Sequence, residues 1–368
     1  MMAFPSAKDA VGRISVMIEP IMADTEHVAL YRKYRPGRFK DVLGQEAVVA
    51  VLEGAIEAGN VSHAYLFSGS RGTGKTSVAR IFAKELGTSE KDLYEIDAAS
   101  YTGVDDIRAI RDAVSTLPFE SKYKVYIIDE VHMLSKSAFN ALLKTLEEPP
   151  KHAIFILATT ELEKLPETVV SRCQTFVFQK PSVSLLKELA LSVAKKEGFD
   201  LPDGAADLVA LLGDGSYRDT HGILQKVISS TRGKRISIEE VERVTGIPKG
   251  TLVNSLLESI AEGKLDAALS AVSSAAEGSI DMKVFLKLLL HKARAVLLLR
   301  FAPELKNELA KQFSEEDFVL LTRLAGQRES KINSALLREL LEAYSETGFS
   351  YLPQLPLELA LSRVLGSA

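Results

Sequence analysis

The sequence contains a single cysteine, Cys173, among its 368 residues. One cysteine excludes an internal disulfide and also excludes a zinc site built from a cluster of cysteines. A chain that does not depend on disulfides suits a reducing compartment, and we therefore expect a cytoplasmic protein.

The sequence also lacks an excess of positive charge and has few long apolar runs. The chain carries 45 Lys and Arg against 49 Asp and Glu, so no global basic excess predicts nucleic-acid binding and any such surface must be local. The most apolar run, residues 285–301, is interrupted by Lys287, His291, Lys292 and Arg294. It is too short between charges to span a membrane, and we interpret it as a buried helix of a bundle.

Residues 1–27 show no strong periodicity, and no continuous apolar stretch marks a signal sequence. Glu19, Asp24 and Glu26 argue against a transit peptide. We expect a loosely ordered tail here, and Met22 is a possible natural start. The remaining composition, 46% apolar and 26% charged, is that of an ordinary globular protein with room for two or three domains.

The strongest motif is GSRGTGKT at residues 69–76, which matches the P-loop pattern without a gap. Its glycines allow a tight turn that presents backbone N–H groups to phosphate. Lys75 can reach the β- and γ-phosphates of a nucleotide, and the Thr76 hydroxyl can hold Mg²⁺. The glycines are Gly69, Gly72 and Gly74.

The flanks of this motif have the required character. Residues 64–68 are apolar and predict a buried strand, and residues 77–86 predict a helix with an apolar face. A strand, a glycine-rich loop and a helix in this order form a phosphate site at a helix N-terminus. A chance match in a surface loop would lack these flanks.

Further strands are predicted at 93–97, 124–129, 153–158 and 175–178, and helical patterns lie between them at 104–117 and 136–146. Strands that alternate with helices indicate a parallel sheet covered on both faces. From residue 181 the segments become short amphipathic helices, at 182–197, 204–213, 218–231 and 238–245. From about residue 248 every segment is helical, which predicts a small helical domain followed by a larger bundle.

A second phosphate-site element follows the strand at 124–129. Asp129 would organise Mg²⁺, and Glu130 would orient and polarise an attacking water. The alternative, an acidic helix cap after a strand, is common in α/β proteins, but the upstream P-loop favours the phosphate site.

Three more residues are weaker candidates. Thr160 follows a strand and could sense a γ-phosphate, although such threonines often satisfy local backbone. Arg172, in Ser-Arg-Cys, could act as an arginine finger or be a surface charge. Arg218 lies in the first turn of a predicted helix, where it opposes the helix dipole.

The role of one basic segment stays open, and three histidines are not candidates for a metal site. The basic and aromatic segment 31–40, YRKYRPGRFK, could contact phosphate or a base, or could be a solvated strap. His63, His132 and His152 are not spaced as metal ligands, and we interpret them as structural or polar-surface residues.

Together these motifs resemble the AAA+ ATPases of bacterial clamp loaders, specifically the γ/τ subunit family of DNA polymerase III. The matching runs include YRKYRPGRFKDVLGQE (31–46), KVYIIDEVHMLSKSAFNALLKTLEEPP (124–150) and FILATTELEKLPETVVSRCQTF (155–176). The resemblance is close over residues 28–245, and beyond them it rests on helical character alone. It implies an α/β P-loop AAA+ domain with a five-stranded parallel sheet, a helical lid domain and a C-terminal helical bundle. The implied domains are a tail at 1–27, the ATPase domain at 28–180, the lid at 181–246 and an oligomerisation collar at 247–368.

The resemblance also implies roles for individual residues. Thr160 corresponds to sensor 1, Arg218 to sensor 2, and Arg172 to a finger that acts in trans on a neighbouring subunit, so the implied catalytic residues are Glu130, Lys75, Arg172, Thr160 and Arg218. The segment 42–45 and the basic strap before it become the adenine-side wall. The implied nucleotide-binding residues are Gly69, Ser70, Arg71, Gly72, Thr73, Gly74, Lys75, Thr76, Ser77, Val42, Leu43 and Arg218. The implied magnesium ligands are Thr76 and Asp129.

The family implies ATP and Mg²⁺ as cofactors and a bacterial ring of five subunits as the assembly. The partners that the family implies are δ, δ′, further γ copies, the β sliding clamp and primer-template DNA. The DNA would be bound through its phosphate backbone. Two departures are visible. Only residues 87–92 separate the P-loop helix from the next strand, so the four-cysteine zinc module of the family is missing and zinc is not expected. The chain also stops near residue 368, which favours a γ-like over a τ-like role.

Two alternative functions belong to other classes of protein. A subunit similar to δ′ would be structural and would not hydrolyse ATP, but it would commonly lack a working P-loop. A Holliday-junction or replication-initiation motor would carry a winged-helix domain after the lid, whereas residues 248–368 show only helical patterns.

Overall fold

The computed structural model describes residues 28–366, except 101–106, 108, 109, 111, 249, 279, 311 and 328. Contacts divide the chain into two compact units. The first comprises the described residues up to Leu186 together with Gly215–Asp219, and the second comprises Lys187–Asp214 and the residues from Thr220 onward. The predicted tail at 1–27 lies outside the described residues, and the three-domain boundaries stay a prediction.

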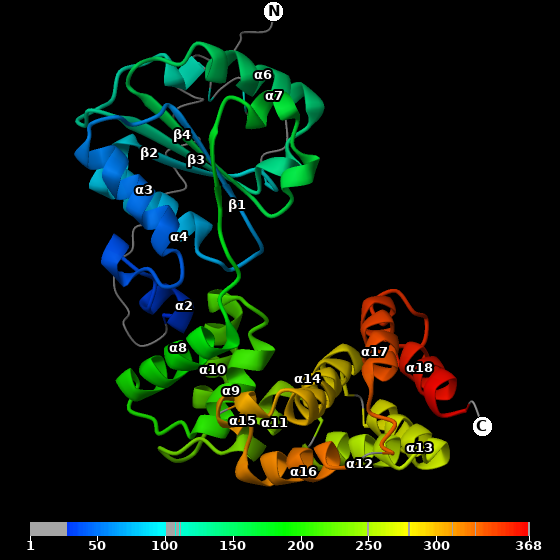
Figure 1. Ribbon diagram of the computed structural model, residues 1–368. Helices are drawn as coiled ribbons and strands as arrows, with labels where there is room; N and C mark the ends of the chain where they lie inside the picture. Colours follow the sequence, from blue (N-terminus) through cyan, green and yellow to red (C-terminus); the bar gives the residue numbers. More distant parts are fainter. Residues whose placement is uncertain are drawn as a thin grey trace, which may run out of the picture. The chain divides into compact units, whose positions relative to one another are not determined.

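The first unit is built on a parallel sheet of five strands in the order β2-β3-β4-β1-β5, as the alternation of strands and helices predicted (Figure 1). The strands are β1 (Ala64–Ser68), β2 (Leu93–Asp97), β3 (Lys124–Asp129), β4 (Ala153–Thr159) and β5 (Gln174–Val177). The carboxyl ends of β1, β3 and β4 meet at one edge, because Ser68 pairs with Thr159 and Ile128 pairs with Leu157. In such sheets ligands bind beyond the carboxyl ends of the strands.

Two apolar layers cover the sheet. Alternate residues of a strand point to opposite faces, so Leu66 belongs to one layer while Tyr65 and Phe67 belong to the other. Helices α3 (Glu46–Glu57) and α4 (Lys75–Glu85) cover the second face, and α6 (Lys136–Glu147) and α7 (Glu167–Val170) cover the first (Figure 1). The three central strands are buried on both faces and therefore read as continuous apolar runs rather than as alternating ones.

Short elements complete this unit. They are α2 (Leu30–Lys33), η1 (Phe39–Asp41), η2 (Glu90–Asp92), η3 (Val131–Met133) and η4 (Leu162–Lys164). Helix α4 begins two residues before the predicted start, because Gly74 takes φ 104° as the N-cap and leaves Lys75 and Thr76 already helical. The predicted helix at 104–117 lies partly outside the described residues.

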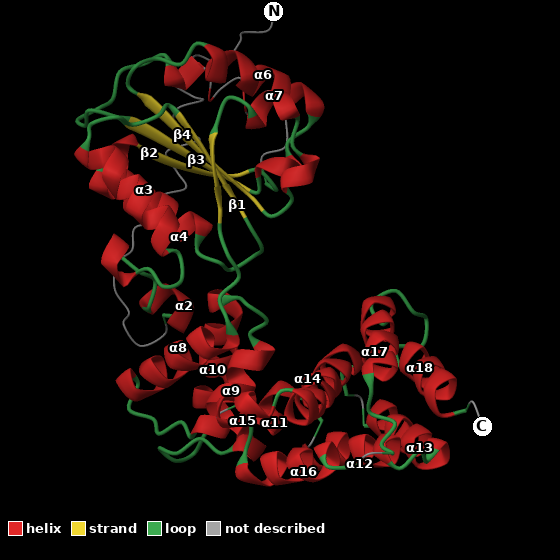
Figure 2. Ribbon diagram, viewed as in Figure 1, coloured by secondary structure: helices red, strands yellow, loops and turns green. Residues whose placement is uncertain are grey.

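The described part of the second unit contains helices and no strand (Figure 2). Helices α8 (Val183–Lys196), α9 (Asp203–Leu212), α10 (Tyr217–Ser230) and α11 (Ile238–Thr245) match the four predicted short helices within one residue; the first residues of α8 and α10 belong to the first unit. The later elements are α12 (Gly250–Ala261), α13 (Leu265–Glu277), α14 (Met282–Phe301), η5 (Pro303–Leu305), α15 (Lys306–Ala310), α16 (Glu315–Ala325), α17 (Ser334–Glu346) and α18 (Leu355–Leu365).

Helix α14 is the core helix that its apolar run predicted. Phe285, Leu286, Leu289 and Val296 are fully buried within a large apolar cluster. Every helix in the described part of the chain is too short or too polar to cross a bilayer.

Candidate nucleotide-binding site

The P-loop connects β1 to α4 as a turn that depends on glycine. Gly69, Gly72 and Gly74 have φ angles of 146°, 76° and 104°, a region that residues with a side chain rarely adopt. Gly72 is also approached closely from elsewhere in the unit. A Cβ atom there would collide with the Ser216 hydroxyl, and the Tyr217 N–H donates to the Gly72 carbonyl at 2.9 Å. The loop is therefore held in shape by residues far away in the sequence.

Lys75 opens helix α4 and is only 6% exposed. Its Nζ donates to the carbonyl oxygens of Gly69 (2.8 Å) and Ser70 (3.0 Å), so the amine lies across the mouth of the loop. Burial lowers the pKa of the Lys75 amine, and the carboxylates of Glu130 and Asp129 partly oppose that shift. The two carboxylates and the amine thus share one electrostatic environment.

The next contact joins the P-loop helix to β3. The Thr76 hydroxyl donates to Asp129 Oδ2 at 2.7 Å. Hard oxygen ligands of this kind, a hydroxyl and a carboxylate, are those that Mg²⁺ prefers, so the pair fits the metal that the motif implies. Among the described residues no three His, Cys, Asp or Glu side chains gather into a metal cluster.

Glu130 follows β3 in an unusual backbone conformation. Its φ is 49°, one of two positive values among non-glycine residues in the described chain, and strain of this kind is often concentrated at functional sites. Its N–H donates to Asp129 Oδ1 at 3.0 Å, and its Oε2 accepts the Thr160 hydroxyl at 3.0 Å. The adjacency of β3 and β4 brings these residues together.

The remaining P-loop residues divide by exposure. Thr73 is 1% exposed and its hydroxyl donates to the Ser70 carbonyl at 2.9 Å, which closes the turn internally. Arg71 is exposed at the outside of the loop. Ser77 is half-buried in the first turn of α4.

The segment 42–45 lies beside the P-loop. The Leu43 carbonyl accepts the Tyr217 hydroxyl at 2.6 Å, while Val42 closes η1. Gln45 is 3% exposed, and its amide pairs with both the N–H and the carbonyl of Gln179. The predicted adenine-side wall is therefore fastened to other parts of the same unit.

Arg218 is exposed in the first turn of α10, as predicted. Its guanidinium lies 5.7 Å from the ring centroid of Tyr31, within the basic and aromatic strap, and its charge contributes to the lowered pKa of Lys75. The charges of Arg218 and Lys75 thus act on each other, and the sensor role of Arg218 stays a prediction.

Arg172 does not join this group. It lies just after α7, where its guanidinium donates to Glu147 Oε1 at 2.6 Å and to the Thr168 carbonyl at 2.8 Å. Its side chain is 34% exposed, and its role in trans stays a prediction.

Sequence reasoning assigned no role in this site to Ser216, Tyr217 or His132. Ser216 and Tyr217 directly precede Arg218 in the sequence, but only the fold places them on the P-loop. The side chain of His132 is only 6% exposed, so His132 is not a polar-surface residue.

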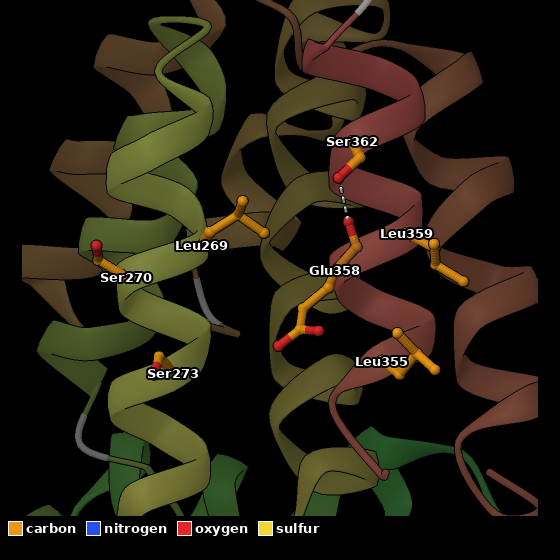
Figure 3. Close-up of a pocket in the computed structure, with 7 residues that line it drawn as sticks. All are labelled: Leu269, Ser270, Ser273, Leu355, Glu358, Leu359 and Ser362. Carbon is orange, nitrogen blue, oxygen red and sulfur yellow. Dashed lines mark hydrogen bonds between the residues drawn. The ribbon is translucent and has the colours of Figure 1, made fainter. Parts of the chain in front are cut away.

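A concavity lies between α13 and α18 in the second unit, and its lining differs in chemistry from the P-loop site (Figure 3). Its lining residues are Leu269, Ser270, Ser273, Leu355, Glu358, Leu359 and Ser362. With leucines, serines and one carboxylate but no cation, this lining does not suit a nucleotide phosphate.

The strand order, the P-loop after β1 and the Asp-Glu pair after β3 define a P-loop nucleotide-binding protein of the AAA+ class. The fold is similar to that of the RuvB Holliday junction branch migration motor of Thermotoga maritima. The match has a TM-score of 0.50 and 25% sequence identity, and it covers 65% of this chain and 85% of the RuvB chain. A single-substitution variant of the same motor matches 70% of this chain and 90% of that one, at 24% identity and a TM-score of 0.50.

Comparison of sequences narrows the class to a family. A family model described as DNA polymerase III, delta subunit matches residues 44–100 and 88–182, and one described as DNA polymerase III subunits gamma and tau domain III matches residues 236–368. The chain belongs to the family of DNA polymerase III gamma and tau subunits.

Individual relatives support this assignment. The chain is 37% identical to DNA polymerase III subunit tau of Bacillus subtilis over 91% of its own length and 63% of the relative's. It is 34% identical to subunit gamma/tau of Mycobacterium bovis (92% and 62%) and 37% identical to subunit tau of Escherichia coli (76% and 47%). The chain thus spans less than two thirds of the length of these relatives.

Proposed function

We propose that this chain is the ATP-hydrolysing subunit of a replicative clamp loader, which couples ATP binding and hydrolysis to opening the β sliding clamp and loading it onto primed DNA. The observation that carries the proposal is the continuous set of contacts from Thr76 through Asp129 and Glu130 to Thr160, beside a buried P-loop lysine, in a member of the gamma and tau family. Such an arrangement suits phosphoryl transfer to water, where positioning and charge stabilisation do most of the work.

The residues would divide the work as follows. The P-loop amides and Lys75 hold the phosphates, and Glu130 orients a water and accepts its proton as the water attacks the γ-phosphorus and the bond to the bridging oxygen breaks. Thr76 and Asp129 would hold Mg²⁺, which when bound neutralises charge on the phosphate oxygens. Thr160 and Arg218 act as sensors of the nucleotide, and Arg172 completes the site of a neighbouring subunit.

The proposed partners follow from the family. They are δ, δ′ and further γ copies in a ring of five, the β clamp, and primer-template DNA held through phosphate contacts without base readout. We place the ATPase domain at 28–180, the lid at 181–246 and an oligomerisation collar at 247–368. The protein would work in the bacterial cytoplasm at the replisome and would need no zinc.

Two specific observations weigh against the alternatives. A structural subunit similar to δ′ has no need for a buried P-loop lysine beside Asp129 and Glu130. A branch-migration motor would carry a winged helix after the lid, while the described residues after Thr245 are helical.

The decisive experiment measures ATP turnover of the full chain with and without δ, δ′, β clamp and primed DNA. We expect low turnover for the isolated chain and strong stimulation by the complete set. Lys75→Ala should abolish nucleotide binding. Arg172→Ala should leave nucleotide binding intact and cut stimulated turnover by about 10³–10⁵-fold, the range for arginine fingers. Unstimulated turnover in the complete mixture would contradict the clamp-loading role, and an inert Arg172→Ala would contradict the finger.

A further inference from the structure

His132 is a buried histidine that the proposed mechanism does not use. It follows the Asp129-Glu130 pair, in the 3₁₀ turn η3 (Val131–Met133) that leads away from β3. Its side chain is only 6% exposed, although it lies between two carboxylates. A polar ring is expensive to bury unless it makes specific bonds, so its contacts should explain its place.

Both ring nitrogens have partners, which lie at the carboxyl ends of strands β3 and β4. Nδ1 lies 3.0 Å from Thr159 Oγ1 and 3.4 Å from Glu130 Oε2. Nε2 lies 3.3 Å from Glu161 Oε1. The Thr159 hydroxyl is itself fully buried and accepts the Glu161 N–H at 3.0 Å. The ring therefore bridges the residue after β3 to the segment that follows β4.

The protonation of the ring decides which of the two carboxylates it can bond. A carboxylate only accepts hydrogen bonds, so each ring nitrogen must carry a proton to bond its carboxylate. A neutral ring can serve one of the two carboxylates, while an imidazolium serves both. Glu161 is also paired with Lys164 at 2.6 Å, which leaves its carboxylate less dependent on the ring than Glu130 is.

The carboxylate of Glu130 is approached from two sides. Within the described part of the chain, both of its side-chain contacts fall on Oε2: the Thr160 hydroxyl at 3.0 Å and His132 Nδ1 at 3.4 Å. The Nδ1 of His132 makes its shorter contact with Thr159 Oγ1, so its approach to Glu130 is a longer charge contact beside the Thr160 hydrogen bond. Because both contacts fall on Oε2, they restrict the rotation of the carboxylate and leave Oε1 for a water. Such groups need to be held within about 0.5 Å of the productive geometry.

We propose that His132 is a positioning residue for ATP hydrolysis, which holds Glu130 through Nδ1 and links it to the sensor segment at Thr159 and Glu161. The inference rests on the proposed ATPase function. Thr160 and His132 both contact Oε2 of Glu130. A shift of residues 159–161, the sensor segment, would therefore reorient Glu130 through both contacts at once. Through His132, the position of the sensor segment therefore influences how Glu130 orients the attacking water.

Two isosteric variants of the full chain, assembled with its partners, test which nitrogen matters. In His132→Asn the amide nitrogen can occupy the place of Nδ1, and in His132→Gln it can occupy that of Nε2. We expect His132→Gln to lower the maximal turnover number by about 10–100-fold, the cost of a misplaced catalytic group, whereas His132→Asn should retain most of it. The dissociation constant for ATP should change by less than about twofold in both.

A matched control is His152→Asn. His152 precedes β4 at the other edge of the sheet, where Nε2 bonds the Val114 carbonyl at 2.9 Å, so its loss perturbs the same sheet without touching Glu130. It should leave the turnover number unchanged. Equal turnover in His132→Asn and His132→Gln, or losses that follow weaker ATP binding or a lower melting temperature, would overturn the positioning role.

Glu130→Gln separates this inference from the function on which it rests. If Glu130→Gln abolishes stimulated turnover while His132→Gln does not affect it, the ATPase proposal stands and the role of His132 fails. If Glu130→Gln turns over ATP like the unmodified chain, the proposed mechanism fails first.

Discussion

At the scale of single residues, the site depends on close approaches that leave no room for a side chain. Gly72 combines a positive φ of 76° with the Ser216 hydroxyl directly against its Cα. Its carbonyl also accepts the Tyr217 N–H, so the P-loop and the start of α10 share one geometry. This position joins the phosphate cradle to the residue before Arg218.

Gly72→Ala is therefore expected to weaken both features. Strain at a left-handed position costs about 1–3 kcal/mol of unfolding free energy, and the displaced Ser216 should shift Arg218 as well. We expect a lower melting temperature and an ATP affinity reduced by at least tenfold, measured by calorimetric titration. Gly54→Ala is the control for ATP affinity, because Gly54 is exposed on α3 with open space at its Cβ. An unchanged affinity in Gly72→Ala would show that the loop adapts without cost.

At the scale of elements, the start of β2 is fastened to the turn before β3 by a buried carboxylate. Asp92 is 0% exposed and accepts backbone N–H groups from Phe119, Glu120 and Ser121 at 2.5, 3.0 and 2.8 Å. Burial alone would raise the pKa of the Asp92 carboxyl, but these N–H donors outweigh it, and the pKa lies below its ordinary value of 3.8. The charged form is thus stabilised by folding.

The sign of the resulting pH dependence follows from linkage. A carboxyl with a lowered pKa in the folded state stabilises fully above its unfolded pKa, and that contribution is lost as pH falls through the folded pKa. Asp92→Asn should remove this contribution and flatten the loss of stability below about pH 4. At pH 7 it should lower the free energy of unfolding by about 1.5–3 kcal/mol, the value of a hydrogen bond to a charged group. Urea unfolding from pH 7 to pH 3 measures both effects.

The control for this prediction is Glu85→Gln, which neutralises an exposed carboxylate near the end of helix α4. It should leave the acid limb of the stability curve as it is. If Asp92→Asn and Glu85→Gln behave alike, the carboxylate at Asp92 is not a pH-dependent anchor.

At the scale of the whole molecule, the second unit exposes large apolar side chains. Phe349 and Tyr351, in the loop between α17 and α18, are 95% and 97% exposed, and Leu355 and Leu359 follow on α18. Clustered exposed aromatics are typical of contact surfaces between proteins. This observation supports the proposal that residues 247–368 form the oligomerisation collar.

Replacing both Phe349 and Tyr351 by serine should therefore weaken assembly of the ring with δ and δ′. Truncating an aromatic side chain at the centre of an interface often costs about 2 kcal/mol or more of binding free energy, on the order of a thirtyfold loss of affinity. We therefore expect the assembled fraction at micromolar concentration to fall at least tenfold by analytical ultracentrifugation. ATP binding by the first unit should be unchanged. Phe301→Ser, at a separate position that is 75% exposed, is the control. Equal assembly of the double variant and the control would remove this loop from the collar surface.

Much of the fold could be predicted from local patterns. The strands at 64–68, 93–97 and 124–129 are correct to the residue. Those at 64–68 and 124–129 are short, mostly apolar runs that are buried on both faces of the sheet. The glycines of the P-loop and the Asp129-Glu130 pair likewise carry their chemistry in consecutive residues. That information is local, and the sequence alone determined it.

What only the tertiary structure decided is long-range adjacency. Residues 130–132 face residues 159–161 because β3 lies beside β4 in the sheet order, and no periodicity encodes which strands are neighbours. The same holds for Ser216 and Tyr217 on the P-loop, and for the pairing of Arg172 with Glu147. Parallel strands are joined by crossovers, so the partners of a site residue lie tens of residues away, and packing rather than spacing brings them together.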